Sequence, residues 1–271
     1  MKHRKGGTVV PPSDFQSERP EKCINKEISE SFPRGCAPAH APTHTHKKMK
    51  KIKVLIACEE SQCETIEFRN AGCLAFSCDL QKCSGGHPEW HVQGDVLQLF
   101  DTPCTFKTMD GKSHTVKQWD LVIAHPPCTY LTKAASTLLF PGKQLNHERY
   151  SKGLEAREFF MRCLEVNAQF VCVENPVPNR IFKLPPPSCY VQPYFFGDKW
   201  QKKTLYWLKN LPPLMPTIFA PEYKSWVHCT RGGKKRSKSF ASIAKQMVAQ
   251  WLPIIEESFR KNNKKHDVAL D

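Results

Sequence analysis

Length and charge narrow the classes to which this chain can belong. Its 271 residues are enough for one substantial domain with tails. No apolar run approaches the length of a membrane span, and the polar N-terminal residues lack the apolar core of a signal peptide, so we expect neither a membrane protein nor a secreted one. Lys and Arg (40) outnumber Asp and Glu (26), and the formal net charge of +14 favours an acidic partner, of which nucleic acid is the commonest.

Cysteine usage points to a reducing compartment. The chain has 13 cysteines, an odd number, scattered along its length. Because disulfides are rare in reducing compartments, we expect a cytoplasmic protein in which most cysteines are small buried hydrophobes. One of them is then available as a nucleophile.

Composition divides the chain into three parts. Residues 1–50 have little apolar content and are rich in proline and histidine, which predicts a disordered basic tail. Residues 51–260 have the apolar patterning of a folded domain. Residues 261–271 are mostly charged and predict a C-terminal tail.

Alternating apolar and amphipathic segments predict an α/β fold. Apolar runs typical of buried strands occupy residues 53–57, 74–78, 120–124, 170–173 and 204–208, with a short strand or turn within 91–96. Helical patterns end at residue 69 and cover 148–167 and 242–259. The last helix has its apolar residues on one face, at Ile243, Met247, Trp251 and Ile254. The proline-rich residues 176–193 suit an extended loop. This order predicts a doubly wound, mostly parallel sheet.

Two predicted strands end in side chains that can carry chemistry. Residues 120–124 lead into a Pro-Pro turn that presents Cys128, and residues 170–173 lead into Glu174 and Asn175. Open parallel sheets bind ligands at the carboxyl ends of their strands. Two prolines hold the backbone rigid, and a cysteine thiolate is a strong nucleophile. We therefore expect Cys128 to attack an electron-poor ring while Glu174 holds a ring nitrogen and Asn175 fixes the loop or the carboxylate by hydrogen bonding.

The ordered motifs resemble those of the DNA cytosine-C5 methyltransferase family. The closer likeness is to its short phage- and prophage-type members, through residues 56–62, 83–91 and 125–131. The resemblance covers about residues 52–251. It implies a Rossmann-like methyltransferase sheet and methyl transfer to C5 of cytosine in DNA. The chain departs from the family in having no room for a large target recognition domain, because the insert between residue 208 and the last helix is short. Cys128 would add to C6 of a flipped-out base, with Glu174 at N3.

The same resemblance implies S-adenosylmethionine as the methyl donor. Its binding loop follows the first strand, and the acidic residues after the second and third strands hold the ribose hydroxyls and the adenine amino group. The expected cofactor-binding residues are Ala57, Cys58, Glu59, Asp79, Asp95 and Pro126.

DNA is the expected partner, held mainly through phosphate contacts. The side chains that we assign to this role are Lys202, Lys203, Arg231, Lys234, Lys235, Arg236 and Lys238. The insert before the last helix is short, so few side chains are available for sequence-specific readout.

Other interpretations remain open. The first loop lacks the glycines of the family, which favours a non-catalytic DNA-binding or decoy protein, and the short insert favours a free nucleotide as substrate. An amino-group methyltransferase is disfavoured, because His125 and Cys128 stand where that class has an acidic or amide residue and an aromatic one.

Some single residues also suit purely structural roles: Asp79 suits a helix N-cap and Asp95 a turn. A Cys/His set has a spacing outside the usual zinc patterns, so no metal is expected at Cys78, Cys83, His87 and His91.

Overall fold

A computed structural model describes residues 51–230, 232 and 238–268. The tail predicted over residues 1–50 lies outside this part of the chain. Among the described residues, no helix combines the length and apolarity that a bilayer crossing requires.

Seven strands form the central sheet. Their order is β3-β2-β1-β6-β7-β10-β8. The strands are β1 (Lys53–Ala57), β2 (Leu74–Asp79), β3 (His91–Gln93), β6 (Leu121–Ala124), β7 (Phe170–Asn175), β8 (Cys189–Val191) and β10 (Thr204–Lys209). The first five strands in spatial order are parallel, whereas β10 is antiparallel to both of its neighbours. The predicted fold class, a doubly wound and mostly parallel Rossmann-like sheet, is confirmed.

Every predicted strand is present, but two features were not foreseen. The proline-rich segment ends in strand β8, which pairs with β10 at the edge of the sheet, so the prediction of a loop throughout residues 176–193 is wrong there. An edge strand tolerates nearby prolines because one of its sides needs no ladder bonds. The unforeseen strands outside the sheet form two pairs, β4 (Cys104–Lys107) with β5 (Ser113–Val116) and β9 (Trp200–Gln201) with β11 (Lys224–Ser225).

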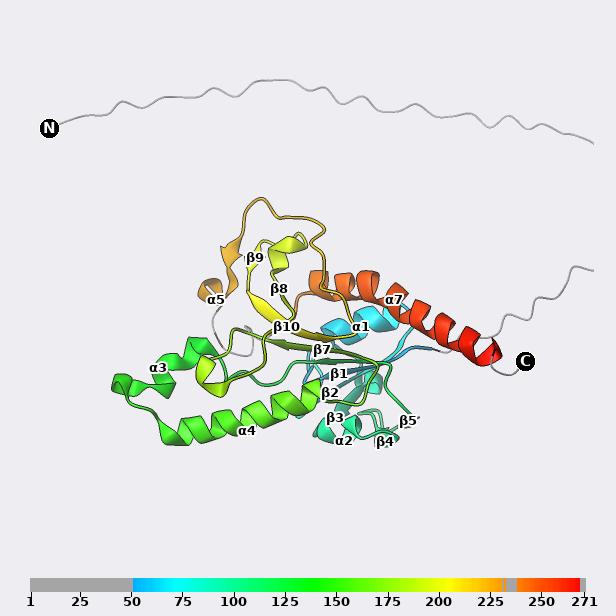
Figure 1. Ribbon diagram of the computed structural model, residues 1–271, viewed down its shortest axis with the longest axis horizontal. Helices are drawn as coiled ribbons and strands as arrows, with labels where there is room; N and C mark the ends of the chain where they lie inside the picture. Colours follow the sequence, from blue (N-terminus) through cyan, green and yellow to red (C-terminus); the bar gives the residue numbers. More distant parts are fainter. Residues whose placement is uncertain (1–50, 231, 233–237, 269–271) are drawn as a thin grey trace, which may run out of the picture. The chain divides into compact units, whose positions relative to one another are not determined.

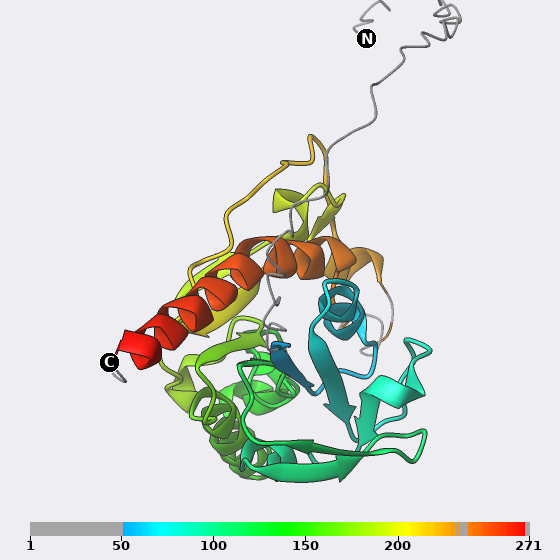
Figure 2. The same cartoon turned by 90° about the vertical axis from the view of Figure 1, so that its right-hand side faces the viewer.

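Helices cover both faces of the sheet. Figure 1 shows α1 (Cys63–Asn70) and α7 (Ala241–Val268) on one side, and α2 (Leu97–Phe100) and α4 (His147–Leu164) on the other. Figure 2 shows α7 lying across the sheet beside α1. The sheet has a hydrophobic core on each face, and β1 contributes to both because successive strand side chains point to opposite faces. Val54 and Ile56 pack with α1 and α7, and Leu55 packs with α2 and α4. Two further short helices are α3 (Ser136–Leu139) and α5 (Trp226–Cys229).

The last helix differs from its prediction in length and in its buried face. It continues to Val268, beyond the predicted end at residue 259 and through most of the predicted tail. Met247 and Trp251 are fully buried as expected, but Ile254 is 38% exposed and Ile255 is buried. A spacing of four residues keeps Met247, Trp251 and Ile255 in one row on the helix, and this row faces the sheet.

The sheet has its topological switch point between β1 and β6. From β1 the chain winds outward through β2 and β3 on one side, and through β6 and β7 on the other. In open α/β sheets, ligands bind beyond the carboxyl ends of the strands at this point. The segments that follow β1 and β6 are the first loop and the Pro-Pro-Cys turn, so the fold places both predicted motifs at one crevice.

Helix α4 packs against the segment after β7 through a glycine, which gives a stability prediction. A methyl group on Gly153 would lie 2.2 Å from two ring carbons of Phe182, which is 1% exposed. Alanine gains about 1 kcal/mol of helix propensity over glycine, whereas overpacking costs about 1–3 kcal/mol. Because the contact is so close, we expect Gly153→Ala to lose about 1–2 kcal/mol in urea unfolding.

Two further variants test the cause of that loss. Ser151→Ala, at an exposed position of α4, is the control for an alanine substitution in this helix and should be near neutral. Adding Phe182→Leu to Gly153→Ala should recover part of the loss, because a smaller side chain leaves room for the methyl group. An unchanged unfolding midpoint for Gly153→Ala would contradict the packing.

Candidate functional site

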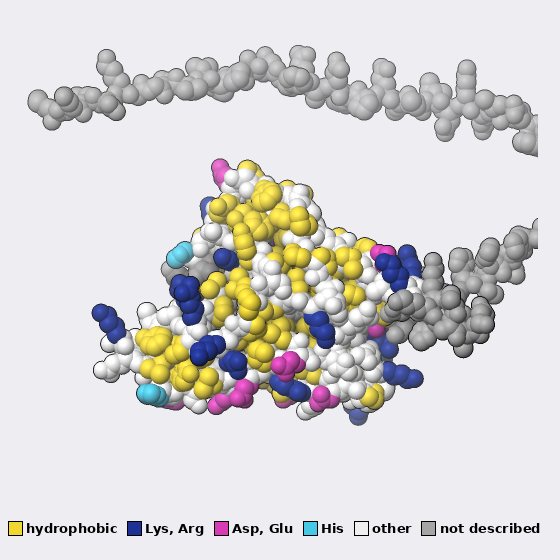
Figure 3. Space-filling model, in the orientation of Figure 1, with side chains coloured by type: hydrophobic (Ala, Val, Ile, Leu, Met, Phe, Trp, Pro, Cys, Tyr) yellow, Lys and Arg dark blue, Asp and Glu magenta, His cyan; other side chains and the backbone are white. Residues whose placement is uncertain are grey.

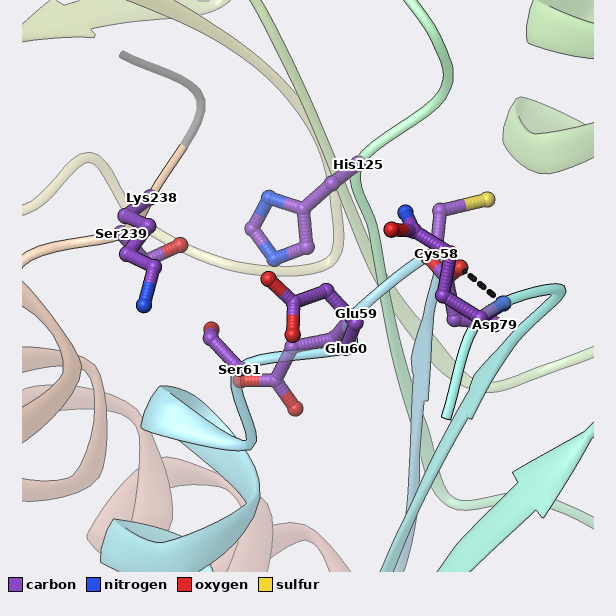
Figure 4. A pocket seen from close by; sticks show the side chains of 9 residues that line it. Cys58, Glu59, Glu60, Ser61, Asp79, His125, Lys238 and Ser239 are labelled. Carbon is purple, nitrogen blue, oxygen red and sulfur yellow. Dashed lines mark hydrogen bonds between the residues drawn. The ribbon is translucent and has the colours of Figure 1, made fainter. Parts of the chain in front are cut away.

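Three adjoining cavities lie at the carboxyl edge of the sheet. The first, of about 540 Å³, is lined by Asp79, Asp95 and Phe159 and is named here the Asp79 cavity. The second, of about 680 Å³, is lined by Cys128 and Glu174 and is named the Cys128 cavity. The third, of about 200 Å³, is named the polar cavity and is lined by Cys58, Glu59, Glu60, Ser61, Asp79, Gln81, His125, Lys238 and Ser239 (Figure 4).

Shared walls connect these cavities. Pro127 lines both the Asp79 cavity and the Cys128 cavity. His125 lines both the Cys128 cavity and the polar cavity, and Cys58 lines the polar and Asp79 cavities. A ligand in the Asp79 cavity and another in the Cys128 cavity would therefore meet at the Pro-Pro turn.

The Pro-Pro-Cys turn is held from two sides. The side-chain amide of Asn175, buried in β7, donates to the Pro126 carbonyl at 2.8 Å. The backbone N–H of His125 donates to the Ala57 carbonyl at 2.9 Å. After the turn, the Cys128 carbonyl accepts from the N–H groups of Leu131 and Thr132. These bonds and the two proline rings fix where Cys128 enters its cavity.

The Cys128 thiol is held in its neutral form. Burial raises its pKa, and the negative charge of Glu174 raises it further, while Lys202 opposes them. The sequence argument relied on a thiolate near neutral pH, but the environment in the free protein favours the thiol. Deprotonation of Cys128 is therefore disfavoured in the free protein.

A buried histidine between two carboxylates lies behind Glu174. His125 Nδ1 lies 2.5 Å from Glu174 Oε2, and His125 Nε2 lies 3.4 Å from Glu64 Oε1. Burial alone would lower the pKa of His125, but the two carboxylates raise it. Burial alone would raise the pKa values of Glu64 and Glu174, but the histidine lowers both. These shifts favour a protonated His125 between two ionised carboxylates, Glu64 and Glu174.

The sequence analysis missed this trio as a site. Glu64 is in the first turn of α1, where an acidic residue is common for helix-dipole reasons, so it gave no distinct signal. His125 was noted only as the first residue of the resembling stretch 125–131 and as a departure from another enzyme class. The available signal was its position directly after a buried strand, next to the strand that ends in Glu174.

The first loop, residues 58–62 between β1 and α1, adopts left-handed backbone conformations without glycine. Cys58 has φ of 60° and Gln62 has φ of 58°, a region that costs most L-residues energy. The loop is clamped by the second resembling stretch: the Ser84 N–H donates to the Glu60 carbonyl at 2.7 Å, and the Gln62 side chain bonds the His87 N–H and carbonyl. The absence of the family's glycines therefore does not prevent a tight turn here.

The predicted cofactor-binding residues divide into two groups. Cys58, Asp79 and Asp95 line the Asp79 cavity, where each aspartate also accepts a backbone bond, from Gln81 N–H and Leu97 N–H respectively. The other three lie elsewhere, at Ala57, Glu59 and Pro126.

Each member of the second group has a structural reason for its place. Ala57 is fully buried in the sheet. Glu59 turns toward α1 and accepts from the Glu64 N–H at 2.7 Å and from the Thr65 hydroxyl at 2.6 Å. Pro126 lines the Cys128 cavity, and the following Pro127 forms the wall of the Asp79 cavity.

The predicted phosphate-contacting residues are only partly described. Lys202 and Lys203 line the Cys128 cavity, and Lys202 Nζ donates to the Lys238 carbonyl at 3.2 Å. Lys238 lines the polar cavity (Figure 4). The other four lie outside the described residues, at Arg231, Lys234, Lys235 and Arg236.

The Cys/His set considered for zinc has other partners. His87 Nδ1 pairs with Glu89, and the His91 ring bonds the Ser77 hydroxyl and the Gln81 carbonyl. Cys78 donates to the Gly94 carbonyl. In the described part of the chain, no three His, Cys, Asp or Glu side chains are grouped to hold a metal ion.

Comparisons with known proteins yield a fold likeness only. No protein-family model and no curated protein matches the chain. Solved structures with a similar fold include a mutant of Spodoptera frugiperda DNMT2 (12% identity, TM-score 0.32) and the Entamoeba histolytica methyltransferase EhMeth (12% identity, TM-score 0.35). Each match covers 65% of this chain, but only 56% of the first protein and 58% of the second. Likenesses this weak concern the fold and not the chemistry.

The buried Glu59 gives a prediction for stability against pH. Burial raises its pKa well above the usual range, and the neighbouring Glu64 charge raises it further. The folded protein therefore holds a proton on Glu59 that the unfolded chain releases, and the stability from this residue is lost as pH rises above the ordinary Glu range. Glu59→Gln is neutral at every pH, so we expect its free energy of unfolding to increase relative to wild type from about pH 5 to pH 8.

Urea unfolding at several pH values measures this difference. Glu155→Gln, at an exposed position on α4, is the matched control and should show no such trend. A wild-type minus Glu59→Gln difference that stays constant with pH would mean that Glu59 is ionised in the folded protein.

Proposed function

We propose that this chain is an S-adenosylmethionine-dependent methyltransferase that acts on C5 of cytosine in DNA. The observation that carries the proposal is the juxtaposition of two cavities at Pro127. One contains a thiol and a carboxylate, and the other is an apolar cavity with two carboxylates. Cytosine activation needs the first pair, and a nucleoside donor fits the second cavity.

The Asp79 cavity has the donor set that an adenosine group needs. Leu80, Val96 and Phe159 supply apolar surface for a purine ring, and the carboxylates of Asp79 and Asp95 can accept hydrogen bonds from hydroxyl or amino groups. When bound, S-adenosylmethionine would supply an electrophilic methyl group at this site. Its reacting end would face Pro127 and, beyond it, the Cys128 cavity.

The side chains of the Cys128 cavity suit activation of a cytosine ring. C5 of cytosine is a weak nucleophile until another nucleophile adds to C6. Addition forms an Sγ–C6 bond, moves the C5=C6 electron pair to C4–C5 and moves the C4=N3 pair onto N3, which takes up a proton. Cys128 is the nucleophile of this scheme, Glu174 holds N3, and Asn175 acts on the turn through its bond to Pro126.

Charge and exposed aromatic rings support a nucleic-acid substrate. Lys202 and Lys203 enter the cavity wall, and the Lys203 ammonium lies 4.7 Å from the centre of the half-exposed Tyr190 ring. Figure 3 shows hydrophobic side chains gathered over the β8 and β9 region, where Phe219 (62% exposed) and Tyr223 (47%) also lie open. Exposed aromatic rings beside lysines can stack with bases while the cations contact phosphates.

A mechanism-based adduct tests the chemistry. DNA that carries 5-fluorocytosine cannot lose its C5 substituent, so the wild-type protein with S-adenosylmethionine should retain a covalent complex on denaturing gels. Cys128→Ser should form none. Equal labelling by Cys128→Ser would overturn the nucleophile assignment, and binding of DNA without any adduct would favour the decoy interpretation. Labelled deoxycytidine nucleotides in place of DNA separate a nucleotide substrate from a polymeric one.

Lys203 gives a prediction for nucleic-acid affinity. We expect Lys203→Ala to weaken binding of a labelled single-stranded oligodeoxynucleotide by about fivefold at low salt, and to reduce the slope of log affinity against log salt by about 0.7. Fluorescence anisotropy at several salt concentrations measures both quantities. Lys203 directly precedes strand β10, and Lys209→Ala, at the far end of that strand, is the control. Equal effects of the two variants would mean that Lys203 contributes only to net charge.

A further inference from the structure

His125 lies where it can pass a proton between two cavities. It follows β6, lines both the polar cavity and the Cys128 cavity, and has one carboxylate on each ring nitrogen. Nδ1 contacts Glu174 on β7 at 2.5 Å, and Nε2 lies 3.4 Å from Glu64 on α1. Figure 4 shows the ring directed into the polar cavity, toward the loop that carries Glu59.

The groups that face His125 come from several elements. Glu64 and Glu174 supply negative charge, Lys202 supplies positive charge from the turn between β9 and β10, and the neutral Glu59 packs against Glu64. Cys128 is in the same cavity as Glu174. Lys238 and Ser239 line the opposite side of the polar cavity. This arrangement keeps one mobile proton on the histidine and leaves Glu174 charged.

A charged Glu174 cannot by itself donate to N3 of cytosine. A carboxylate only accepts hydrogen bonds, whereas stabilising the C6 adduct requires a proton on N3. The short contact to His125 supplies that proton directly, because a proton that leaves Nδ1 arrives on the Glu174 carboxyl group. The polar cavity of about 200 Å³ has room for a few waters through which the pair can exchange protons with solvent.

We propose that His125, held between Glu64 and Glu174, is a relay residue that delivers a proton through Glu174 to N3 of the target ring and takes it back when the ring is released. The proposal rests on the cytosine chemistry proposed above. In the forward step the Cys128 thiol releases its proton to solvent water and the Sγ–C6 bond forms. The C5=C6 electron pair moves to C4–C5 and the C4=N3 pair moves onto N3, while one proton leaves His125 for Glu174 and one leaves Glu174 for N3. The reverse transfers restore thiol, carboxylate and imidazolium. His125 and Glu64 are thus positioning residues that act through Glu174.

Hydrogen exchange at C5 tests the relay without any methyl donor. The C6 adduct makes C5 nucleophilic, so C5 takes up a solvent proton, and reversal of the adduct releases the original hydrogen. The 271-residue chain is incubated with an oligodeoxynucleotide that contains [5-³H]cytosine, and tritium release is followed against pH. Because the reactive state holds one proton on the relay and none on Cys128, the profile should be bell-shaped.

Two variants then separate a relay from a structural role. Glu64→Gln removes a charge that favours the His125 imidazolium and so lowers the pKa of His125. The limb of the profile that reports titration of His125 should therefore move to lower pH by about one unit. His125→Gln should lower the maximal rate about a hundredfold, because a general acid contributes roughly that factor, and it should abolish that limb because glutamine does not titrate. His147→Gln and Glu148→Gln, at exposed positions of α4, are the matched controls. Circular dichroism melting verifies that each variant is folded.

Three outcomes decide the matter. A shifted limb in Glu64→Gln, with controls unchanged, supports the relay even if His125→Gln does not fold. Slower exchange with both limbs unmoved means that the trio only orients Glu174 and overturns the relay alone. If wild type releases no more tritium than Cys128→Ser, the adduct chemistry is wrong and the relay falls with it.

Discussion

The pairing register of β6 with β7 fixes the site. Ala124 pairs with Val173, so the next residues of the two parallel strands, His125 and Glu174, emerge side by side. One step further, the Asn175 amide reaches the Pro126 carbonyl. A slip of one residue would turn every side chain of a strand to the opposite face. The strand pairing that builds the hydrophobic core therefore also aligns His125 with Glu174 and brings Asn175 to the turn that carries Cys128.

Burial makes this alignment electrostatically strong. Isolated charges are costly away from water, and the three groups Glu64, His125 and Glu174 stay ionised because each neutralises another. Glu59 meets the same problem differently: it holds a proton and uses its oxygens to accept bonds from the start of α1. The first turn of α1 is thereby tied to the site, since Glu64 both donates its backbone N–H to Glu59 and faces His125.

Strand ends could be predicted from the sequence, and tertiary neighbours could not. The position of Cys128, Glu174 and Asn175 at the carboxyl edge of the sheet could be predicted because continuous apolar runs mark buried strands and polar residues mark their ends. β7 nevertheless includes Glu174 and Asn175, because both pair with β10, a partner thirty residues away. Glu64 was missed because its burial depends on how α1 packs against the sheet, which local pattern does not encode. Edge strand β8 was missed because local proline content predicted a loop.

The neutral thiol and the charged carboxylate impose an order on the proposed reaction. In the free protein the Glu174 charge keeps the Cys128 pKa raised, and a buried thiol is a poor nucleophile that resists oxidation. When N3 of a bound ring accepts a proton through Glu174, His125 becomes neutral. The polar edge of the ring would also take the place of water in the Cys128 cavity. Lys202, which lowers the pKa of both Cys128 and Glu174, opposes the effect of the Glu174 charge on the sulfur. Attack would thus be favoured only when a ring of matching shape and basicity fills the cavity.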